Sequence, residues 1–176
     1  KAEDVGVVET NQTILAEFRE HCYSFADIAK FKPLKIVVDA GNGMAGKMVP
    51  VVFEKLPCEV VPMYFELDGN FPNHPANPIE KANNAALVEK IKSEKADLGL
   101  AFDGDADRVF FFDENGVSLD SSFVTAMIAK KILEKNLGEK IIYTVTVSKA
   151  VPEVVAQNGG ESLLTKVGHS YIKQVM

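Results

Sequence analysis

The order of strand-like and helix-like segments is the strongest constraint on the fold of this chain. Short apolar runs typical of buried strands occur at 34–38, 59–64, 98–102, 109–112, 141–145 and 162–164. Helical patterns lie around them, at 11–29, 47–56, 83–95, 121–135, 150–157 and 168–176. Strands that alternate with helices form βαβ units, which build mostly parallel sheets. The pattern therefore predicts the α/β fold class.

Three local expectations accompany this pattern. Pro62 predicts that the 59–64 strand lies at a sheet edge, because proline cannot donate to the hydrogen-bond ladder. Pro50 is compatible with its helix only near the first turn. In the 121–135 helix the large apolar side chains are expected to face the core, namely Phe123, Met127, Ile128, Ile132 and Leu133.

A domain boundary is expected near Val117, after the turn at 115–116, where the pattern changes register. This gives two units, residues 1–117 and 118–176. The chain starts with Lys1 rather than Met and stops a few residues into a helical pattern. We therefore expect a piece of a longer protein, with the second unit truncated.

Charge and cysteine content limit the classes of partner. The 19 Lys and Arg against 25 Asp and Glu give a net charge of -6, and no basic cluster interrupts this acidity. Nucleic acid and anionic membrane surfaces are therefore not expected as partners. Cys22 and Cys58 cannot form a disulfide framework, and no apolar run is long enough to span a membrane. A cytoplasmic protein is the prediction.

Three carboxylates follow the 98–102 strand at alternate positions, Asp103, Asp105 and Asp107. They would repel one another without a cation, and Gly104 and Ala106 between them let the backbone fold so that their oxygens converge. An all-oxygen set favours a hard divalent ion over zinc. Room for waters and a phosphate oxygen suits Mg²⁺ in phosphoryl transfer. The alternative interpretation is a solvated turn between two strands.

The same spacing is also similar to a calcium-binding EF-hand loop, with Glu114 at its twelfth position. Arg108 stands at the sixth position, where that loop requires glycine, and the flanks are strand-like rather than helical. The EF-hand interpretation therefore fails. Arg108 either pairs with the neighbouring carboxylates or binds a phosphate or another substrate oxygen from the mouth of the loop.

The segment 41–46, Gly-Asn-Gly-Met-Ala-Gly, matches the dinucleotide-binding pattern Gly-x-Gly-x-x-Gly between a strand and a helix. Glu66 lies twenty residues after Gly46, where that fingerprint has an acidic residue. Against it, Asp39 precedes the turn and would face a pyrophosphate with like charge. Two interpretations stay open here, a nucleotide-binding Rossmann-like module and a purely structural strand-to-helix turn.

Four motifs together resemble the α-D-phosphohexomutase superfamily, in its phosphomannomutase/phosphoglucomutase branch. They are VVDAGNGMAG at 37–46, DGNFPNHPANP at 68–78, AFDGDADRVFFFDENG at 101–116 and TKVGHSYIK at 165–173. They occur in the family's order and span most of the chain. The resemblance implies two consecutive α/β/α sandwich units with mixed, mostly parallel sheets. These would be the family's domain 2 and the N-terminal part of its domain 3.

The resemblance also implies an activity. In that family a phosphoserine gives its phosphoryl group to a hexose phosphate and regains one from the bisphosphorylated sugar, so hexose 6-phosphate and hexose 1-phosphate interconvert. The implied roles are Mg²⁺ binding by Asp103, Asp105 and Asp107, substrate contact by Arg108, and orientation of the sugar by Gly168 and His169.

The phosphoserine itself is expected upstream, because no serine of this chain lies in a loop of the Thr-Ala-Ser-His-Asn-Pro type. The expected partners are thus a hexose phosphate and the remaining mutase domains of the same full-length chain. Thr146 stands where some bifunctional members have Lys, which leaves the choice between glucose and mannose open. His74, in the proline-rich loop, is assigned no catalytic role. We expect the 176-residue chain to be inactive alone, and a regulatory or decayed mutase-like domain is a further alternative.

Overall fold

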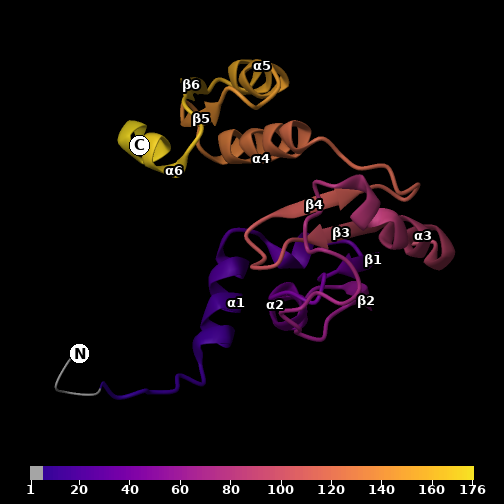
Figure 1. Ribbon diagram of the computed structural model, residues 1–176. Helices are drawn as coiled ribbons and strands as arrows, with labels where there is room; N and C mark the ends of the chain where they lie inside the picture. Colours follow the sequence, from indigo (N-terminus) through magenta and orange to yellow (C-terminus); the bar gives the residue numbers. More distant parts are fainter. Residues whose placement is uncertain (1–5) are drawn as a thin grey trace. The chain divides into compact units, whose positions relative to one another are not determined.

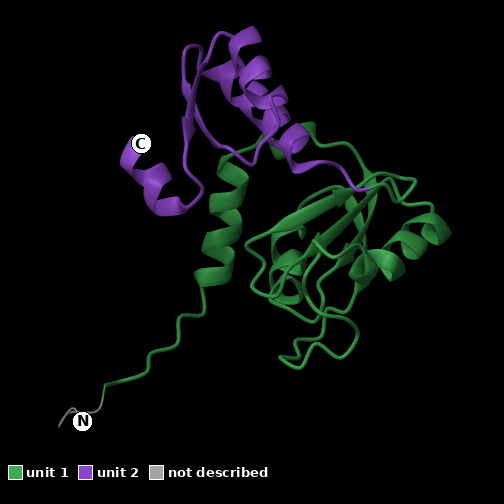
Figure 2. Ribbon diagram, turned by 45° about the horizontal axis from the view of Figure 1, so that its top comes forward, with its two compact units in different colours: residues 1–117 green, residues 118–176 purple. Residues whose placement is uncertain are grey.

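The computed structural model describes residues 6–176, and the chain divides into two compact units (Figure 2). The first unit ends at Val117, and the second is Ser118–Met176. Figure 1 gives the order of the helices and strands. Each unit has its own apolar core.

A four-stranded sheet forms the centre of the first unit (Figure 1). Its strands, in spatial order, are β2 (Cys58–Met63), β1 (Leu34–Asp39), β3 (Leu98–Phe102) and β4 (Val109–Phe112). The first three run parallel, and β4 pairs antiparallel with β3 as a hairpin. β2 lies at the edge, as Pro62 predicts. The α/β class with a mostly parallel sheet is confirmed.

Helices cover both faces of this sheet. On one face α2 (Ala45–Val52) packs against a core that includes Val38, and on the other α3 (Ala85–Glu94) packs against a core that includes Val37. Successive strand side chains point to opposite faces, so adjacent residues of β1 serve different cores. The first unit is therefore an α/β/α sandwich.

The remaining helices of the first unit lie before β1 and before α3 in the chain. α1 (Ile14–Ser24) is shorter than the predicted 11–29 helix. The N–H groups of its N-cap residue Thr13 and its first residue Ile14 donate to the side chain of Asn11. It lies against α2, where the Tyr23 hydroxyl donates to the carbonyl of Val52 at 2.7 Å. Two short 3₁₀ helices follow, η1 (Ile28–Lys30) and η2 (Lys81–Asn84).

The expectation for α2 is wrong in length and in the place of its proline. The helix ends at Val52 rather than near residue 56, and Pro50 is its sixth residue, beyond the first turn. Proline has no N–H for the intrahelical bond at that position, and the helix ends two residues later. Pro152 differs, since it is the third residue of α5 (Ala150–Gln157), where the N–H has no intrahelical partner anyway.

The second unit holds a two-stranded parallel sheet and three helices. Its elements are α4 (Ser121–Lys135), β5 (Lys140–Thr144), α5, β6 (Glu161–Thr165) and α6 (His169–Val175). α4 begins after Asp120, whose carboxylate accepts the N–H of Ser122 at 2.7 Å and so caps the helix. The core of this unit lies between α4, α5 and β5.

The structure corrects the predicted core face of α4. Of the five large side chains expected to be buried, four are exposed, namely Phe123, Met127, Ile128 and Ile132. The buried residues of the helix are instead Ser122, Ala126, Ala129 and Leu133. Their spacing of four, three and four residues also defines one helix face. Small side chains on that face let α4 approach α5 closely.

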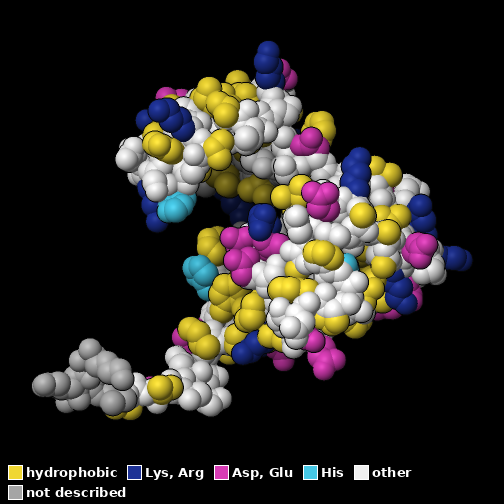
Figure 3. All heavy atoms as spheres, in the orientation of Figure 1, with side chains coloured by type: hydrophobic (Ala, Val, Ile, Leu, Met, Phe, Trp, Pro, Cys, Tyr) yellow, Lys and Arg dark blue, Asp and Glu magenta, His cyan; other side chains and the backbone are white. Residues whose placement is uncertain are grey.

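The visible surface mixes side chains of all kinds (Figure 3). Lys and Arg side chains are scattered over this face and do not gather into one basic patch, and hydrophobic side chains reach the surface of the second unit. In residues 6–176 no helix combines the length and apolar character needed to cross a membrane.

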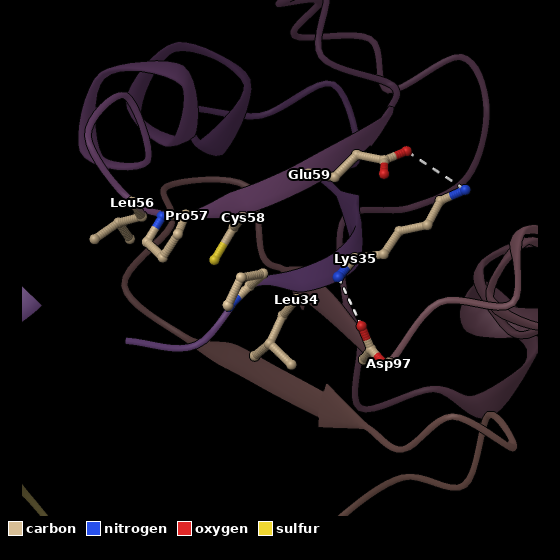
Figure 4. A pocket seen from close by; sticks show the side chains of 8 residues that line it. Leu34, Lys35, Leu56, Pro57, Cys58, Glu59 and Asp97 are labelled. Atoms are coloured by element: carbon tan, nitrogen blue, oxygen red, sulfur yellow. Dashed lines mark hydrogen bonds and ion pairs between the residues drawn. The ribbon is translucent and has the colours of Figure 1, made fainter. Parts of the chain in front are cut away.

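An ion-pair cluster surrounds Lys35 at the end of the sheet where β1 and β2 begin (Figure 4). The Lys35 ammonium lies 2.8 Å from a Glu94 carboxylate oxygen and 3.5 Å from one of Glu59. The backbone N–H of Lys35 donates to Asp97 at 2.7 Å. These contacts satisfy the charge of Lys35 within the protein and connect β1 to β2 and α3.

We predict that α4 tolerates change at its large exposed residues and not at its small buried ones. Ala129→Leu overfills the α4–α5 contact and lowers the free energy of unfolding by about 1–3 kcal/mol. Met127→Leu, at a position 68% exposed, stays within about 0.5 kcal/mol of the wild type. Urea denaturation followed by circular dichroism measures both, and a larger loss for Met127→Leu would contradict the assignment of the buried face.

We also predict a pH dependence of stability from Glu94. Its hydrogen bond to Lys35, then that to Lys90, lower the pKa of Glu94 from 4.5 to about 2. Because the folded-state pKa is the lower one, the stabilisation is complete above about pH 4.5 and is lost as the pH falls toward about 2.

The variant Lys35→Met should return the pKa of Glu94 toward its ordinary value and flatten the loss of stability in this window. An NMR titration of the Glu94 carboxyl, with denaturation at each pH, tests this, and Lys90→Met is the control with a smaller expected effect. An unchanged pKa of Glu94 in Lys35→Met would refute the assignment.

Candidate metal centre

Two loops meet where the parallel strands β1 and β3 end. The strands are paired in register, with Asp39 at the end of β1 opposite Ala101 near the end of β3. The glycine turn, residues 40–46, leaves β1 and includes the first two residues of α2, and the Asp loop, residues 103–108, leaves β3. In open α/β sheets ligands bind at this carboxyl end of the strands. The candidate site is therefore at the expected edge.

The Asp loop is the connection of the β3–β4 hairpin, in which Phe102 pairs with Val109. The N–H of Ala106 donates to the carbonyl of Asp103 at 3.1 Å, and the N–H of Asp103 donates to the carbonyl of Arg108 at 3.3 Å. Ala106 adopts a left-handed conformation with φ of 62°, which a small side chain tolerates better than a β-branched one. These contacts close the loop into a compact turn.

Three carboxylates converge on this turn. One oxygen from each of Asp103, Asp105 and Asp107 lies within 4.8 Å of the others, and in residues 6–176 no other group of three His, Cys, Asp or Glu side chains meets this criterion. Two oxygens that each lie about 2.1 Å from the same ion are at most about 4.2 Å apart. The three carboxylates therefore need to move only slightly closer together to bind one ion. The donor set fits a hard divalent cation such as Mg²⁺.

Arg108 holds the buried member of this set. Asp103 is 1% exposed, and its carboxylate accepts the N–H of Arg108 at 3.1 Å and the guanidinium Nε at 2.6 Å. Burial alone would raise the pKa of Asp103, but the hydrogen bonds and charge of Arg108 outweigh it and leave this pKa below its ordinary value. Asp103 is therefore ionised and fixed before any ligand binds.

Arg108 also keeps part of its guanidinium available. Only Nε pairs with the loop, with Asp103 and, at 3.3 Å, with Asp107. In the described part of the chain neither terminal nitrogen makes a hydrogen bond, and the side chain is 57% exposed. The pairing interpretation of Arg108 is thus observed, while two donor groups stay free for an anion.

An apolar pocket of about 440 Å³ borders the Asp loop on the side of α1 and α2. Asp105 is its only charged lining residue, and its walls include Phe18, Met44, Met48 and Phe102. Asp105 is exposed to solvent, so it lies where the Asp loop meets this pocket.

The glycine turn contacts protein where a nucleotide would have to bind. A Cβ on Gly43 would lie 2.5 Å from the carbonyl oxygen of Gly104, and one on Gly46 would lie 2.1 Å from that of Phe65. The N–H groups that a pyrophosphate would need already donate within the protein, those of Gly41, Asn42, Gly43, Met44 and Gly46. This geometry supports the structural interpretation of the turn.

The structure brings two further residues to this edge that the sequence did not connect. Asp39 is 2% exposed, and His74 Nε2 lies 3.0 Å from its carboxylate. Burial raises the pKa of Asp39, while the charge of His74 and the N–H of Gly41 act in the opposite direction. The two residues are 35 positions apart, so no local pattern in the sequence indicates the pair.

The remaining predicted site residues belong to the second unit. Gly168 connects β6 to α6 with a φ of 127°, a conformation that favours glycine. His169 is the first residue of α6 and is exposed. Both therefore lie after the carboxyl end of a parallel strand, as the Asp loop does in the first unit.

Comparison with known proteins matches both units of the chain to consecutive domains of one protein family. The family model described as "Phosphoglucomutase/phosphomannomutase, alpha/beta/alpha domain II" matches residues 16–116, and the model for domain III of the same family matches residues 120–176. The resemblance inferred from the four motifs is confirmed.

Individual proteins with similar sequences carry related names. The chain is 43% identical over 150 residues to a phosphomannomutase/phosphoglucomutase of Pseudomonas aeruginosa, covering 85% of this chain and 32% of that protein. It is 37% identical over 169 residues to a phosphomannomutase of Vibrio cholerae, covering 93% and 36%. The chain thus spans about a third of the length of these relatives.

A solved structure supports the same similarity. The crystal structure of a phosphoglucomutase/phosphomannomutase family protein from Burkholderia thailandensis matches with a TM-score of 0.83 and 34% sequence identity. The match covers 92% of this chain and 35% of the other.

The role of the glycine turn gives a testable prediction. Gly46→Ala should lower the free energy of unfolding by about 1–3 kcal/mol or more, because the new Cβ meets the backbone at Phe65. Gly69→Ala, at a position with no atom within 4 Å of the added Cβ, is the matched control and should stay within about 0.5 kcal/mol. Equal stability of the two variants in chemical denaturation would show that the turn does not need its glycine for packing.

Proposed function

The chain belongs to the phosphoglucomutase/phosphomannomutase family, and we propose that it provides the metal-binding and sugar-contacting parts of a hexose phosphate mutase. The reaction interconverts hexose 6-phosphate and hexose 1-phosphate, with glucose, mannose or both as the sugar. A phosphoserine on a further domain of the same protein supplies the phosphoryl group, and a bisphosphorylated sugar is the intermediate. A cytoplasmic location and the absence of nucleic-acid and membrane partners stay predictions.

The observation that carries this proposal is the convergence of three carboxylates on the Asp loop. Their oxygens lie within 4.8 Å of one another, and Asp103 is buried and ionised. Such a set is unfavourable by itself, because like charges at this distance repel. A divalent cation bound between the carboxylates would offset that repulsion, so cation binding accounts for three acids in one short loop.

Asp103, Asp105 and Asp107 would hold Mg²⁺ in this proposal. When bound, the ion offsets the negative charge on the phosphoryl group during transfer. The three side chains orient that charge at the carboxyl edge of β3. Their attachment to a hairpin of the central sheet limits their motion, which favours a fixed position for the reacting phosphate.

Arg108 and the second unit would bind the substrate. The terminal guanidinium nitrogens of Arg108 are free donors beside the carboxylates, and a guanidinium is suited to bidentate binding of phosphate oxygens. Gly168 and His169, after β6, would orient the sugar hydroxyls through the backbone and the imidazole. In this proposal Arg108 would contact the phosphate, Gly168 and His169 would contact the sugar, and the phosphoserine would come from outside this chain.

The nucleotide-binding alternative receives less support. Its signal was the Gly-x-Gly-x-x-Gly pattern at 41–46, and the N–H groups of that turn already donate within the protein. Asp39, which would repel a pyrophosphate, points instead at Gly41 and His74. The decayed-domain alternative predicts a loop that no longer binds a metal, and the following experiment separates it from the proposal.

We predict that the chain binds Mn²⁺, used as a probe for Mg²⁺, at the Asp loop. Asp105→Asn removes one of three charged ligands and should weaken the affinity at least about tenfold. Glu114→Gln is the matched control, since Glu114 lies outside the cluster and serves only in the rejected EF-hand alignment. Isothermal titration and the electron paramagnetic resonance signal of free Mn²⁺ measure the affinity.

The same substitution links the metal to the reaction. In a protein with all the mutase domains, Asp105→Asn should lower turnover of glucose or mannose phosphate by at least about 10²-fold, and Glu114→Gln should leave it unchanged. The 176-residue chain alone should show no turnover. Wild-type metal affinity or wild-type turnover in Asp105→Asn, or turnover by the chain alone, would contradict the proposal.

A further inference from the structure

The Asp39–His74 pair is a buried contact that the proposed reaction does not use. The carboxylate of Asp39 accepts the N–H of Gly41 at 2.8 Å and faces His74 Nε2 at 3.0 Å and 3.2 Å from its two oxygens. The side chains are 2% and 16% exposed. Such a pair is costly to break, because it would leave a buried carboxylate without its partner.

The hydrogen bonds of His74 define the charge of the pair. His74 Nδ1 lies 2.9 Å from the carbonyl oxygen of Pro75, and since a carbonyl has no proton to give, Nδ1 carries one. Nε2 then either donates a second proton to the Asp39 carboxylate or accepts one from the neutral acid. In both cases the pair holds a shared proton and has no net charge, so it adds no negative charge to an edge that already carries three acids.

The pair attaches one loop to another. His74 belongs to the cover loop, residues 68–78, and Asp39 precedes the glycine turn. The same two segments also meet through Asn73, whose amide donates to Asn42 at 2.8 Å, and through the N–H of Asp68, which donates to the Asn42 carbonyl at 3.0 Å. His74 thus belongs to a set of polar contacts that hold the cover loop onto the turn.

Both attached segments touch the Asp loop at Gly104, between two of the predicted metal ligands. The N–H of Met44, in the glycine turn, donates to the Gly104 carbonyl at 3.0 Å. Two side chains of the cover loop also lie next to Gly104. A Cβ added to Gly104 would lie 3.3 Å from the ring of Phe71 and 3.7 Å from the methyl group of Ala76. Phe71 keeps this place with a left-handed φ of 49°, which costs energy unless contacts such as these compensate for it.

We propose that His74 is a positioning residue for the metal loop: its contact with Asp39 holds the cover loop and the glycine turn against Gly104, and this keeps the carboxylates of the Asp loop converged before the metal binds. The inference rests on the proposed function, because it assumes that the Asp loop binds a divalent cation. His74 acts through Asp39 and Gly104 and itself touches neither metal nor substrate. Outer partners of this kind contribute to affinity by fixing ligands in place.

The test is a titration of the 176-residue chain with Mn²⁺. His74→Ala should weaken Mn²⁺ binding about tenfold, and Asp39→Ala, which removes the other half of the contact, should weaken it by a similar factor. Because both changes break one contact, the double variant should lose no more than either single variant, rather than about 10²-fold. His74→Gln, whose side-chain amide can donate to Asp39, should recover the affinity to within about threefold of the wild type.

Two controls and one substitute variant separate positioning from a general loss of stability. Ile91→Val removes a buried methyl on the α3 side of the sheet and costs about 0.5–1.5 kcal/mol, and it should leave the Mn²⁺ affinity unchanged. His21→Gln changes an exposed histidine of α1 and should also have no effect. Phe71→Ala, which removes the ring from Gly104, should weaken Mn²⁺ binding, and it replaces His74→Ala if that variant does not fold.

The outcomes are distinguishable. The inference is overturned if folded His74→Ala binds Mn²⁺ with wild-type affinity. If His74→Ala does not fold, wild-type affinity in folded Phe71→Ala overturns it. An equal loss of affinity in His74→Ala and His74→Gln also overturns it. If the wild type and Asp105→Asn bind Mn²⁺ equally, the metal site of the proposed function fails instead. A ¹⁵N NMR spectrum of the wild type gives an independent readout, since a proton on Nδ1 of His74 is expected and an unprotonated Nδ1 contradicts the pair as described.

Discussion

Electrostatic repulsion among Asp103, Asp105 and Asp107 is the constraint on which the rest of the site depends. Three carboxylates whose oxygens lie within 4.8 Å of one another separate unless the protein or a cation holds them. The protein contributes Arg108, which binds the buried Asp103 through its backbone N–H and its guanidinium. In the proposed function a divalent cation would complete the balance. The converged loop is therefore the main support for our proposal that this edge takes part in the chemistry of a hexose phosphate mutase.

The central sheet and the glycine turn hold the Asp loop in place. β3 carries the Asp loop at its end, and its neighbour β1 carries the glycine turn. The turn lies so close to the loop that Gly43 has no room for a side chain next to Gly104. A motif that looks like a phosphate-binding pattern in the sequence thus serves here as a contact surface between two loops. The same close approach is the route by which, in our proposal, residues that do not touch the metal would position its ligands.

Local patterns were sufficient for most of the fold. Apolar runs and turn residues predicted the strands, the edge position of β2 and the helix at 121–135, because these depend on neighbouring residues in the chain. The face of α4 was predicted wrongly, since the burial of Ala126 and Ala129 rather than Met127 and Ile128 depends on how closely α5 packs. Pro50 in the second turn of α2 likewise reflects tertiary packing that overrides a local preference.

Some residues of the candidate site could also be predicted from local sequence patterns, and others could not. Spacing alone indicated Asp103, Asp105 and Asp107, because all three leave one strand in one short loop. It could not indicate Asp39 and His74, which meet only through the pairing of β1 with the sheet and the path of the cover loop. The spacing also left two interpretations of Arg108 open, pairing with the carboxylates and binding of an anion. The structure shows Nε of Arg108 pairing with Asp103 and Asp107, while the two terminal nitrogens stay available.

One measurement tests the central claim directly, a crystal structure of the chain soaked in Mn²⁺ with anomalous diffraction data. The account predicts a single strong peak at the Asp loop, with an oxygen from each of Asp103, Asp105 and Asp107 about 2.1–2.3 Å away. Carboxylates turned away from one another into solvent, with no peak between them, would contradict it.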